Sequence, residues 1–272
     1  RAYRVKYYAD LVTRKPDLER FYFGWFKRAL EVWNGMKINV YVGYDRRQDS
    51  PPKFNEVKNP CYEVCKQSIL NYNDKVNIQP IKLDELIDRE VYYREVDPLA
   101  STEFTYSRFL TPHLNNYDGI AVYCDSDFLW QCDIDELLEY YDERYAVMCV
   151  QHDYIPKSDT KMDGVVQTTY PRKNWSSLMM FNCEHEDTKN LTLKNVNEKS
   201  PKYLHRMEWT DEVGSIPITY NYLEGDYEYI ENPKVIHFTN GGPWHETWKG
   251  EYGNKWVTEY MKVWKENIII MK

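Results

Sequence analysis

Along the chain, the spacing of apolar positions alternates between a pattern typical of strands and a pattern typical of helices. Short runs of β-branched and aromatic residues predict buried strands, whereas apolar residues three and four apart predict amphipathic helices. Their alternation is typical of an α/β protein with a mostly parallel central sheet and flanking helices. Strands are predicted over 38–43, 76–81, 120–124, 145–150 and 234–236, helices over 17–33, 61–70, 83–89, 105–114 and 134–141, and a long polar loop over 151–172.

A helix stop divides the chain near its N-terminus. The predicted helix over 17–33 is followed by Asn34 and Gly35, residues that commonly end helices. Because the charges on this helix are mixed rather than basic, docking on the next domain is favoured over binding to a membrane surface. We expect an N-terminal amphipathic helical segment over 1–35 and one α/β domain over 36–272.

Composition and charge limit the possible partners. The 272 residues are 42% hydrophobic, which is enough for a buried core, and their net charge is -8. Nonspecific affinity for nucleic acid comes from clustered Lys and Arg that release counterions, so this charge disfavours a nucleic-acid partner. No apolar stretch approaches the roughly 20 residues that cross a bilayer, so no transmembrane segment is expected.

The cysteines lack the paired spacing of metal ligands, and several lie within apolar runs. This pattern indicates buried thiols in a reducing compartment, which predicts a cytoplasmic protein. The residues are Cys61, Cys65, Cys124, Cys132, Cys149 and Cys183.

Two carboxylates stand at the end of one predicted strand. The apolar run over 120–124 stops at Asp125, and Asp127 follows after one serine. Ligands of open α/β sheets bind beyond the carboxyl ends of the strands, and paired carboxylates there can hold a divalent cation with substrate phosphates. An aspartate that caps the next helix is the commoner explanation of a bare Asp-x-Asp, so the tripeptide alone does not decide.

Four segments in sequence order resemble family 8 glycosyltransferases of the GT-A fold. Together they span roughly residues 37–248, and four ordered motifs are more specific than one. The resemblance implies a GT-A-like, Rossmann-type sandwich. The segments are 39–45 (first strand and nucleotide loop), 106–138 (arginine-containing helix, strand and Asp-x-Asp), 174–182 (a strand ending in Phe-Asn) and 237–244 (the closing motif).

The resemblance implies a metal site made of Asp125, Asp127 and His237. Independently of it, His237 follows the predicted strand 234–236, so it should lie at the same sheet edge as the two aspartates. The resemblance implies Mn²⁺ or Mg²⁺, and an imidazole ligand favours Mn²⁺ because Mg²⁺ prefers oxygen.

The resemblance also implies contacts with the two substrates. Arg108 is expected to contact the donor sugar or diphosphate during catalysis. Asp211 and Glu212, which follow Trp209, are expected as a catalytic pair beneath the donor sugar, although capping of a helix N-terminus explains them equally well. The expected donor-binding residues are Val42, Gly43, Tyr44, Asp45, Arg108, Ser126, Asn182, Gly241, Gly242 and Trp244.

One position departs from the family pattern. Family 8 enzymes commonly carry a lysine immediately before the closing Pro-Trp, where this chain has Gly242. The charge of a leaving diphosphate would then need Arg108 or the backbone N–H groups of the paired glycines. Arg172 and Lys173 are weaker candidates for that role. We expect Gly242→Lys to be tolerated or to compensate in part for the loss of Arg108.

The sequence predicts a metal-dependent hexosyl- or pentosyltransferase. It would move a sugar from a nucleotide-diphosphate donor, a UDP-sugar, to a hydroxyl of a glycan, glycolipid or glycoprotein, with the retention of configuration that the family likeness implies. One alternative is a sugar nucleotidyltransferase, which needs a Gly-rich basic loop where residues 44–50 have no glycine run. The other is a non-catalytic carbohydrate- or metal-binding module, but the acids lack the spacing of a calcium loop.

Overall fold

The computed structural model describes residues 38–95, 97, 100–153 and 171–270. The helix predicted over 17–33 and most of the loop predicted over 151–172 lie outside these ranges. The division of the chain at residue 35 therefore remains a prediction.

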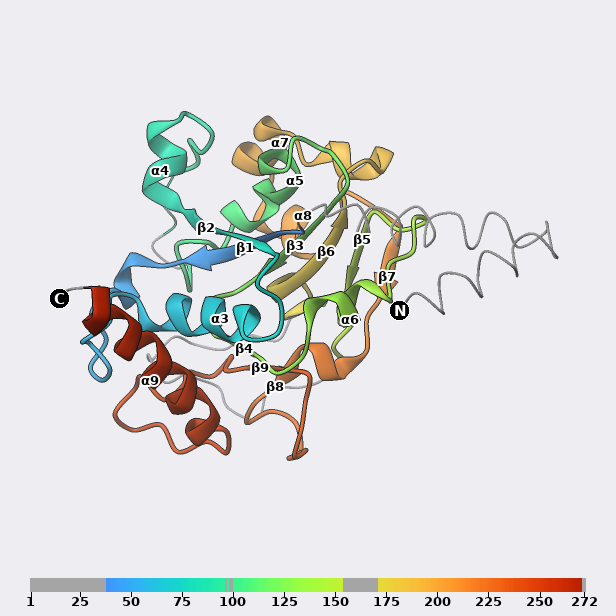
Figure 1. Cartoon of the computed structure of the whole chain (residues 1–272). Helices are drawn as coiled ribbons and strands as arrows, with labels where there is room; N and C mark the ends of the chain where they lie inside the picture. The colour runs from blue at the N-terminus through green and yellow to red at the C-terminus, as the bar shows by residue number, and fades with distance from the viewer. Residues whose placement is uncertain (1–37, 96, 98–99, 154–170, 271–272) are drawn as a thin grey trace.

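A six-stranded sheet forms the centre of the molecule (Figure 1). Its strand order is β2-β1-β3-β6-β5-β7, and β6 is the strand that runs opposite to its neighbours. The predicted α/β class and mostly parallel sheet are confirmed. The strands are β1 (Asn39–Tyr44), β2 (Asn77–Lys82), β3 (Ile120–Cys124), β5 (Val147–Cys149), β6 (Leu178–Asn182) and β7 (Val213–Ser215).

A second, three-stranded sheet lies below the first. It has the order β4-β9-β8, with β4 (Phe128–Trp130) antiparallel and β8 (Tyr222–Leu223) parallel to β9 (Val235–His237). The strand predicted over 234–236 corresponds to β9. The other two strands were not predicted, since two or three residues are too few to show a period.

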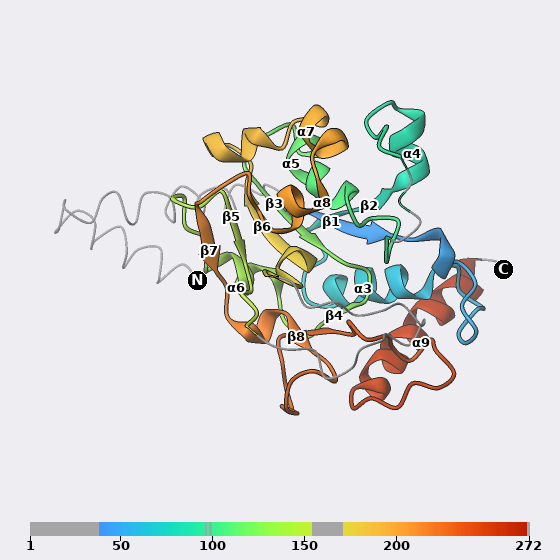
Figure 2. The same cartoon turned by 180° about the vertical axis from the view of Figure 1, so that it is seen from behind.

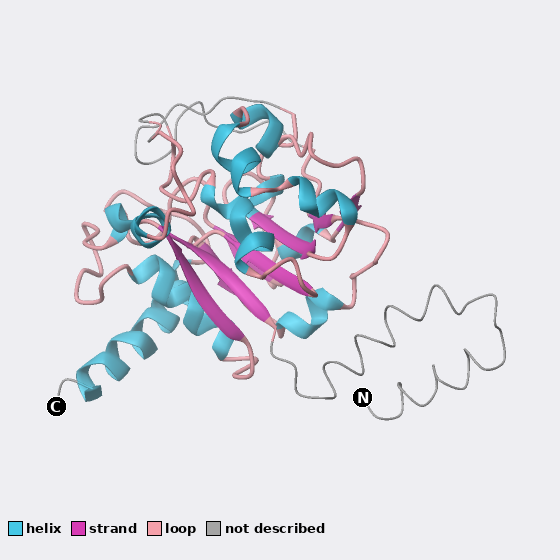
Figure 3. Cartoon of the chain, turned by 90° about the horizontal axis from the view of Figure 1, so that it is seen from above, coloured by secondary structure: helices cyan, strands magenta, loops and turns pink. Residues whose placement is uncertain are grey.

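Helices cover both faces of the large sheet (Figures 1 and 2). Seen from above, the twisted strands lie beneath the helices of the upper layer (Figure 3). The upper layer holds α4 (Leu83–Asp88), α5 (Thr111–Leu114), α7 (Leu193–Glu198) and α8 (Pro201–His205). The lower layer holds α3 (Pro60–Leu70) and α6 (Ile134–Leu138). Helix α9 (Gly253–Ile270) packs on α3 and the small sheet.

The strand β3 is apolar throughout because helices bury both of its faces. Ile120, Val122 and Cys124 belong to the core below the sheet, whereas Ala121 and Tyr123 belong to the core above it. A strand buried on both sides has no polar face, which accounts for its continuous apolar run.

The local caps match the sequence signals in part. Asp133 accepts a hydrogen bond from the backbone N–H of Asp135, and α6 begins at Ile134, the first residue of the helix predicted over 134–141, but ends at Leu138. The helix predicted over 105–114 is instead a 3-10 turn, Ser107–Leu110, followed by α5. Pro112 lacks an N–H and stands in the first turn of α5, where that donor is not needed.

No helix in the described ranges combines the length and apolar character that crossing a bilayer requires. All six cysteines are buried and unpaired, as expected.

Gly43 is required by close packing at the end of β1. A Cβ atom on this residue would lie 2.6 Å from the ring of Phe104, which is fully buried. We expect Gly43→Ala to lower the free energy of unfolding by about 1–3 kcal/mol, the usual effect of overpacking. Urea denaturation measures this loss. Adding Phe104→Leu should recover part of it, and a double variant no more stable than Gly43→Ala would contradict the packing argument.

Candidate metal centre

Asp125 and Asp127 lie where the chain passes from the large sheet to the small one. Asp125 follows β3, and Asp127 precedes β4. Backbone hydrogen bonds hold both residues: the N–H of Asp125 donates to Ser177 O at 3.0 Å, and the N–H of Phe238 donates to Asp127 O at 3.0 Å. The position of the acidic pair is thus set by both sheets.

His237 reaches the acidic pair because β9 pairs with β4. His237 stands opposite Phe128 in the strand register, and the two rings stack with centroids 4.4 Å apart. Its Nε2 lies 3.5 Å from Asp127 Oδ1. One ligand atom from each of Asp125, Asp127 and His237 lies within 4.8 Å of the other two, so the three residues predicted from sequence do come together.

Asn221 selects the form of His237 that can bind a cation. Its Oδ1 lies 2.9 Å from His237 Nδ1, and its Nδ2 donates to Ser177 Oγ at 2.9 Å. An amide oxygen only accepts, so Nδ1 carries a proton, and in the neutral imidazole the lone pair is then on Nε2, which faces Asp127. This outer hydrogen bond is the one that metal-binding histidines usually make.

Arg108 and Tyr123 hold the carboxylate of Asp125. Arg108 Nη1 lies 2.9 Å from Asp125 Oδ1 and also donates to Ser176 O at 3.0 Å. Tyr123 donates its hydroxyl to Asp125 Oδ1 at 2.7 Å. Burial raises the pKa of Asp125 above its ordinary value, and the positive charge of Arg108 opposes that shift.

The donor set fits a divalent cation. Two carboxylates and a neutral imidazole suit Mn²⁺, and Mg²⁺ would be served less well by the nitrogen ligand. With a neutral imidazole, His237 Nε2 and Asp127 Oδ1 are two acceptors 3.5 Å apart, an arrangement that a cation stabilises. The geometry therefore supports a metal centre.

The turn after β1 lies close to the acidic pair. Ser126, between the two aspartates, lies 3.5 Å from the side-chain oxygen of Gln48 in that turn. Tyr44 is buried and donates its hydroxyl to Asp49 Oδ1 at 2.8 Å. The expected donor residues Val42, Gly43, Tyr44, Asp45 and Ser126 thus gather at one edge of the sheet.

Asp45 is engaged within that turn. Its carboxylate pairs with Arg47 at 2.7 Å and accepts the backbone N–H of Glu103 at 3.2 Å. Arg46 pairs in turn with Glu103 at 2.7 Å. These contacts tie the turn after β1 to the segment that leads to Arg108.

The closing motif is shaped by its tryptophan. Trp244 is 3% exposed and packs on Phe238 and Trp256, so its ring belongs to the core near α9. A Cβ atom on Gly242 would lie 2.3 Å from that ring. The expectation that Gly242→Lys is tolerated is therefore wrong, because any side chain here displaces a buried tryptophan. Gly241 has φ 97, which favours glycine.

Three predicted site residues lie at the opposite edge of the large sheet. Asn182 ends β6, which runs against β3, and it pairs with Ile120 at the beginning of β3. Asp211 and Glu212 precede β7, and Glu212 O accepts the N–H of Ala146 just before β5. At about 3.3 Å per residue along the strands these positions are more than about 15 Å from the metal centre.

The segment after Trp209 also differs from the expectation in its local structure. Strand β7 begins at Val213, so no helix starts at the acidic pair. Trp209 is buried and stacks on Phe181. We leave Asp211, Glu212 and Asn182 out of the site.

Sequence reasoning also missed the contact between His152 and Tyr227 near the centre. His152 follows β5 at the same edge as Asp125, and its Nδ1 lies 2.7 Å from the hydroxyl of Tyr227. Burial, with a smaller effect of nearby His237, lowers the pKa of His152 to about 3, so this imidazole is neutral at physiological pH. No motif marks the pair, since the two residues are distant in sequence.

The architecture is that of GT-A glycosyltransferases. The structure superimposes on GlyE of Streptococcus pneumoniae TIGR4 with a TM-score of 0.55 and 14% identity, over 85% of this chain and 63% of the GlyE chain. It superimposes on the galactosyltransferase LgtC with a TM-score of 0.53 and 8% identity, over 83% of this chain and 96% of that one. At such identities the likeness shows the fold, and this chain spans less than two thirds of GlyE.

The sequence places the chain in a family. It is 46% identical over 239 residues to Protein CDI of Arabidopsis thaliana, covering 85% of this chain and 88% of that protein. The chain belongs to the CDI family. No protein-family model matches it.

Asn221 offers a direct test of the metal centre. Asn221→Ala removes the acceptor that fixes the imidazole proton on Nδ1, so we expect Mn²⁺ affinity to fall about 10–100-fold. Titration calorimetry with MnCl₂ measures the change. Asn221→Asp keeps an acceptor oxygen and should retain binding. Equal Mn²⁺ affinity in wild type and a folded Asn221→Ala would show that His237 does not bind the ion.

Proposed function

We propose that the chain is a metal-dependent glycosyltransferase that moves a sugar from a nucleotide-diphosphate donor to a hydroxyl acceptor. The observation that carries this proposal is the convergence of Asp125, Asp127 and His237 at the carboxyl edge of a GT-A fold. A UDP-sugar is the proposed donor, and a glycan, glycolipid or glycoprotein the proposed acceptor. Membership of family 8 and retention of configuration belong to the same proposal.

The proposed metal ligands are Asp125, Asp127 and His237, with Mn²⁺ as the favoured ion. When bound, such a cation would offset the negative charge that grows on the leaving diphosphate. The chain's own part is to hold the three ligands in place. Asn221 orients the imidazole, and backbone hydrogen bonds fix both aspartates.

Arg108 has a positioning role in this proposal. Its guanidinium lies against Asp125, within the protein interior, where the two residues are 6% and 8% exposed. It favours the ionised carboxylate, which is the form that binds a cation. From the sequence, Arg108 is expected to contact the donor sugar or diphosphate. In the structure its guanidinium is instead paired with Asp125.

Donor recognition is assigned to the turn after β1 and to the closing motif. Val42, Gly43, Tyr44 and Asp45 would lie beside the nucleotide, together with Ser126. Gly241 and Gly242 would bring backbone close to phosphate, while Trp244 supports them from the core.

A sugar nucleotidyltransferase would use basic residues after β1 to bind a triphosphate. Arg46 and Arg47 occupy that turn but pair with Glu103 and Asp45. Calorimetry with UDP, with and without Mn²⁺, tests the transferase proposal directly: binding of UDP that requires the metal supports it. A protein that binds UDP equally well in EDTA would contradict it.

Asp127 is the ligand whose charge is easiest to remove without changing its shape. We expect Asp127→Asn to lower turnover of a UDP-sugar at least about 100-fold, as the loss of one preorganised electrostatic group typically does. Release of UDP measures turnover, and EDTA should abolish it in the wild type. Full activity of the variant in EDTA would rule out the metal centre.

Arg108→Ala leaves a buried carboxylate without its counterion. We expect turnover per folded molecule to fall more than about tenfold, because Asp125 loses the positive charge that favours its ionised form. The control is Arg172→Ala, whose Nη1 donates to Arg206 O at 2.6 Å. It should change turnover less than about threefold. A lower melting temperature with unchanged kinetics in Arg108→Ala would make Arg108 purely structural.

A further inference from the structure

The loop between β8 and β9 carries an exposed aromatic ring. Tyr229 is 57% exposed, and its ring stacks on Tyr252 with centroids 5.5 Å apart and planes 22° apart. Tyr252 is itself buried and packs against Tyr222 of β8. One face of the Tyr229 ring is therefore supported by the protein.

Hydrogen bonds hold the backbone on both sides of Tyr229. Tyr222 donates its hydroxyl to Glu228 O, the carbonyl before Tyr229, and Tyr252 donates to Ile230 O, the carbonyl after it. Lys255 at the start of α9 donates to Glu231 O at 3.1 Å. An exposed ring on a backbone fixed in this way loses little freedom when a ligand binds, and such preorganisation favours binding.

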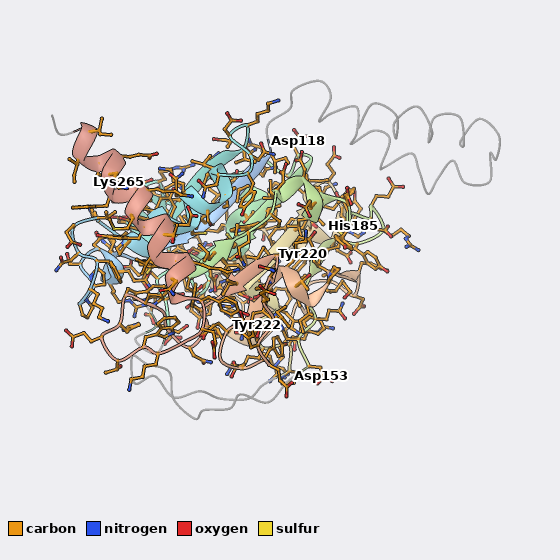
Figure 4. All side chains as sticks on the ribbon, turned by 60° about the horizontal axis from the view of Figure 1, so that its bottom comes forward. Asp118, Asp153, His185, Tyr220, Tyr222 and Lys265 are labelled. Atoms are coloured by element: carbon orange, nitrogen blue, oxygen red, sulfur yellow. The ribbon has the colours of Figure 1, made fainter. Side chains whose placement is uncertain are left out.

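A chain of contacts leads from the candidate metal centre to the segment just before Tyr229. The N–H of Tyr227 donates to Leu223 O at 3.1 Å, and Leu223 is the register partner of His237. The Tyr227 hydroxyl meets His152, which lies at the same edge. Tyr229 is two residues further on, at most about 7 Å along the backbone. Figure 4 turns this side forward, with Tyr222 and Asp153, next to His152, labelled on it.

The surroundings of the ring suit a carbohydrate. A sugar ring has an apolar C–H face that stacks on an aromatic side chain and a rim of hydroxyls that donate hydrogen bonds. Glu228, Glu231 and Asn232 next to Tyr229 are exposed and supply acceptor oxygens. These acids and the net charge of -8 disfavour a nucleic acid, whose bases would also stack.

We propose that Tyr229 is a stacking platform for a distal sugar unit of an oligosaccharide acceptor. That this oligosaccharide is an acceptor rests on the proposed transferase function. The binding of a sugar to Tyr229 is independent of that function. Because the ring lies outside the metal centre, it contacts a long acceptor and not a short one. Comparing long with short oligosaccharides therefore distinguishes binding at Tyr229 from binding at the reacting sugar.

Binding of defined oligosaccharides tests the platform. Cellohexaose, xylohexaose and maltohexaose are titrated against the full chain, each beside its disaccharide, with affinity followed by calorimetry. For the hexasaccharide that binds, we expect Tyr229→Ala to raise Kd about fivefold or more, the loss of one aromatic contact. The disaccharide affinity should not change. Tyr229→Phe keeps the ring and should bind like the wild type.

Tyr93→Ala is the matched control. Tyr93 is 55% exposed, nearly as much as Tyr229, but lies beside Glu198 of α7 in the layer above the large sheet. It should bind every probe like the wild type. Equal hexasaccharide affinity in Tyr229→Ala and wild type overturns the proposal, as does the absence of hexasaccharide binding. A dimer lost in Tyr229→Ala, seen by light scattering, would also overturn it in favour of a second copy of the chain.

Calorimetry with UDP and Mn²⁺ on the same samples separates the two proposals. Metal-dependent UDP binding in Tyr229→Ala at wild-type strength, together with weakened hexasaccharide binding, supports both. If hexasaccharide binding depends on Tyr229 but UDP does not bind, the platform proposal is supported and the transferase proposal is contradicted. Intact UDP binding with unaffected hexasaccharide binding keeps the transferase and removes the platform.

Discussion

Asp125 ends a strand that is buried on both faces, and its carboxylate lies inside the protein with Arg108 as its counterion. Taking a carboxylate out of water is unfavourable, and removing its partner from such a pair costs roughly 3–5 kcal/mol. The arginine is held in turn by the carbonyls of Phe104 and Ser176. This one ion pair therefore links the segment before α5, the end of β3 and the start of β6.

The same pair resolves a conflict at the centre. Burial raises the pKa of Asp125 and so disfavours the carboxylate form that binds a cation, whereas full exposure would leave the side chain without a fixed direction. Arg108 and the Tyr123 hydroxyl both favour the ionised form of Asp125 and fix the direction of its carboxylate. A buried metal ligand needs a countercharge of this kind more than an exposed one does.

The convergence of Asp125, Asp127 and His237 and the class of the fold could be predicted from the family resemblance together with local sequence signals. An apolar run that stops at Asp125 predicts a buried strand with a carboxylate at its end, and His237 follows a strand of the same kind. Asn221 could not be predicted as the partner of His237, because their contact depends on the pairing of β8 with β9. Two strands of the small sheet have no period to detect. From the sequence, Gly242 is interpreted as a position that could accept a lysine. A glycine stands there because the buried ring of Trp244 leaves no room for a side chain.

The direction of each strand explains which motif residues reach the centre. Strands β1, β3, β5 and β7 run the same way, so the residues that follow them, such as Asp45, Asp125 and His152, share one edge. Strand β6 runs the other way, and the residues that precede it face that edge instead. This is why Ser177 O accepts the N–H of Asp125, while Asn182 lies at the far end. A motif at the end of a strand therefore identifies a site residue only once the direction of that strand in the sheet is known. The spacing of apolar residues does not reveal whether a strand runs parallel or antiparallel to its neighbours.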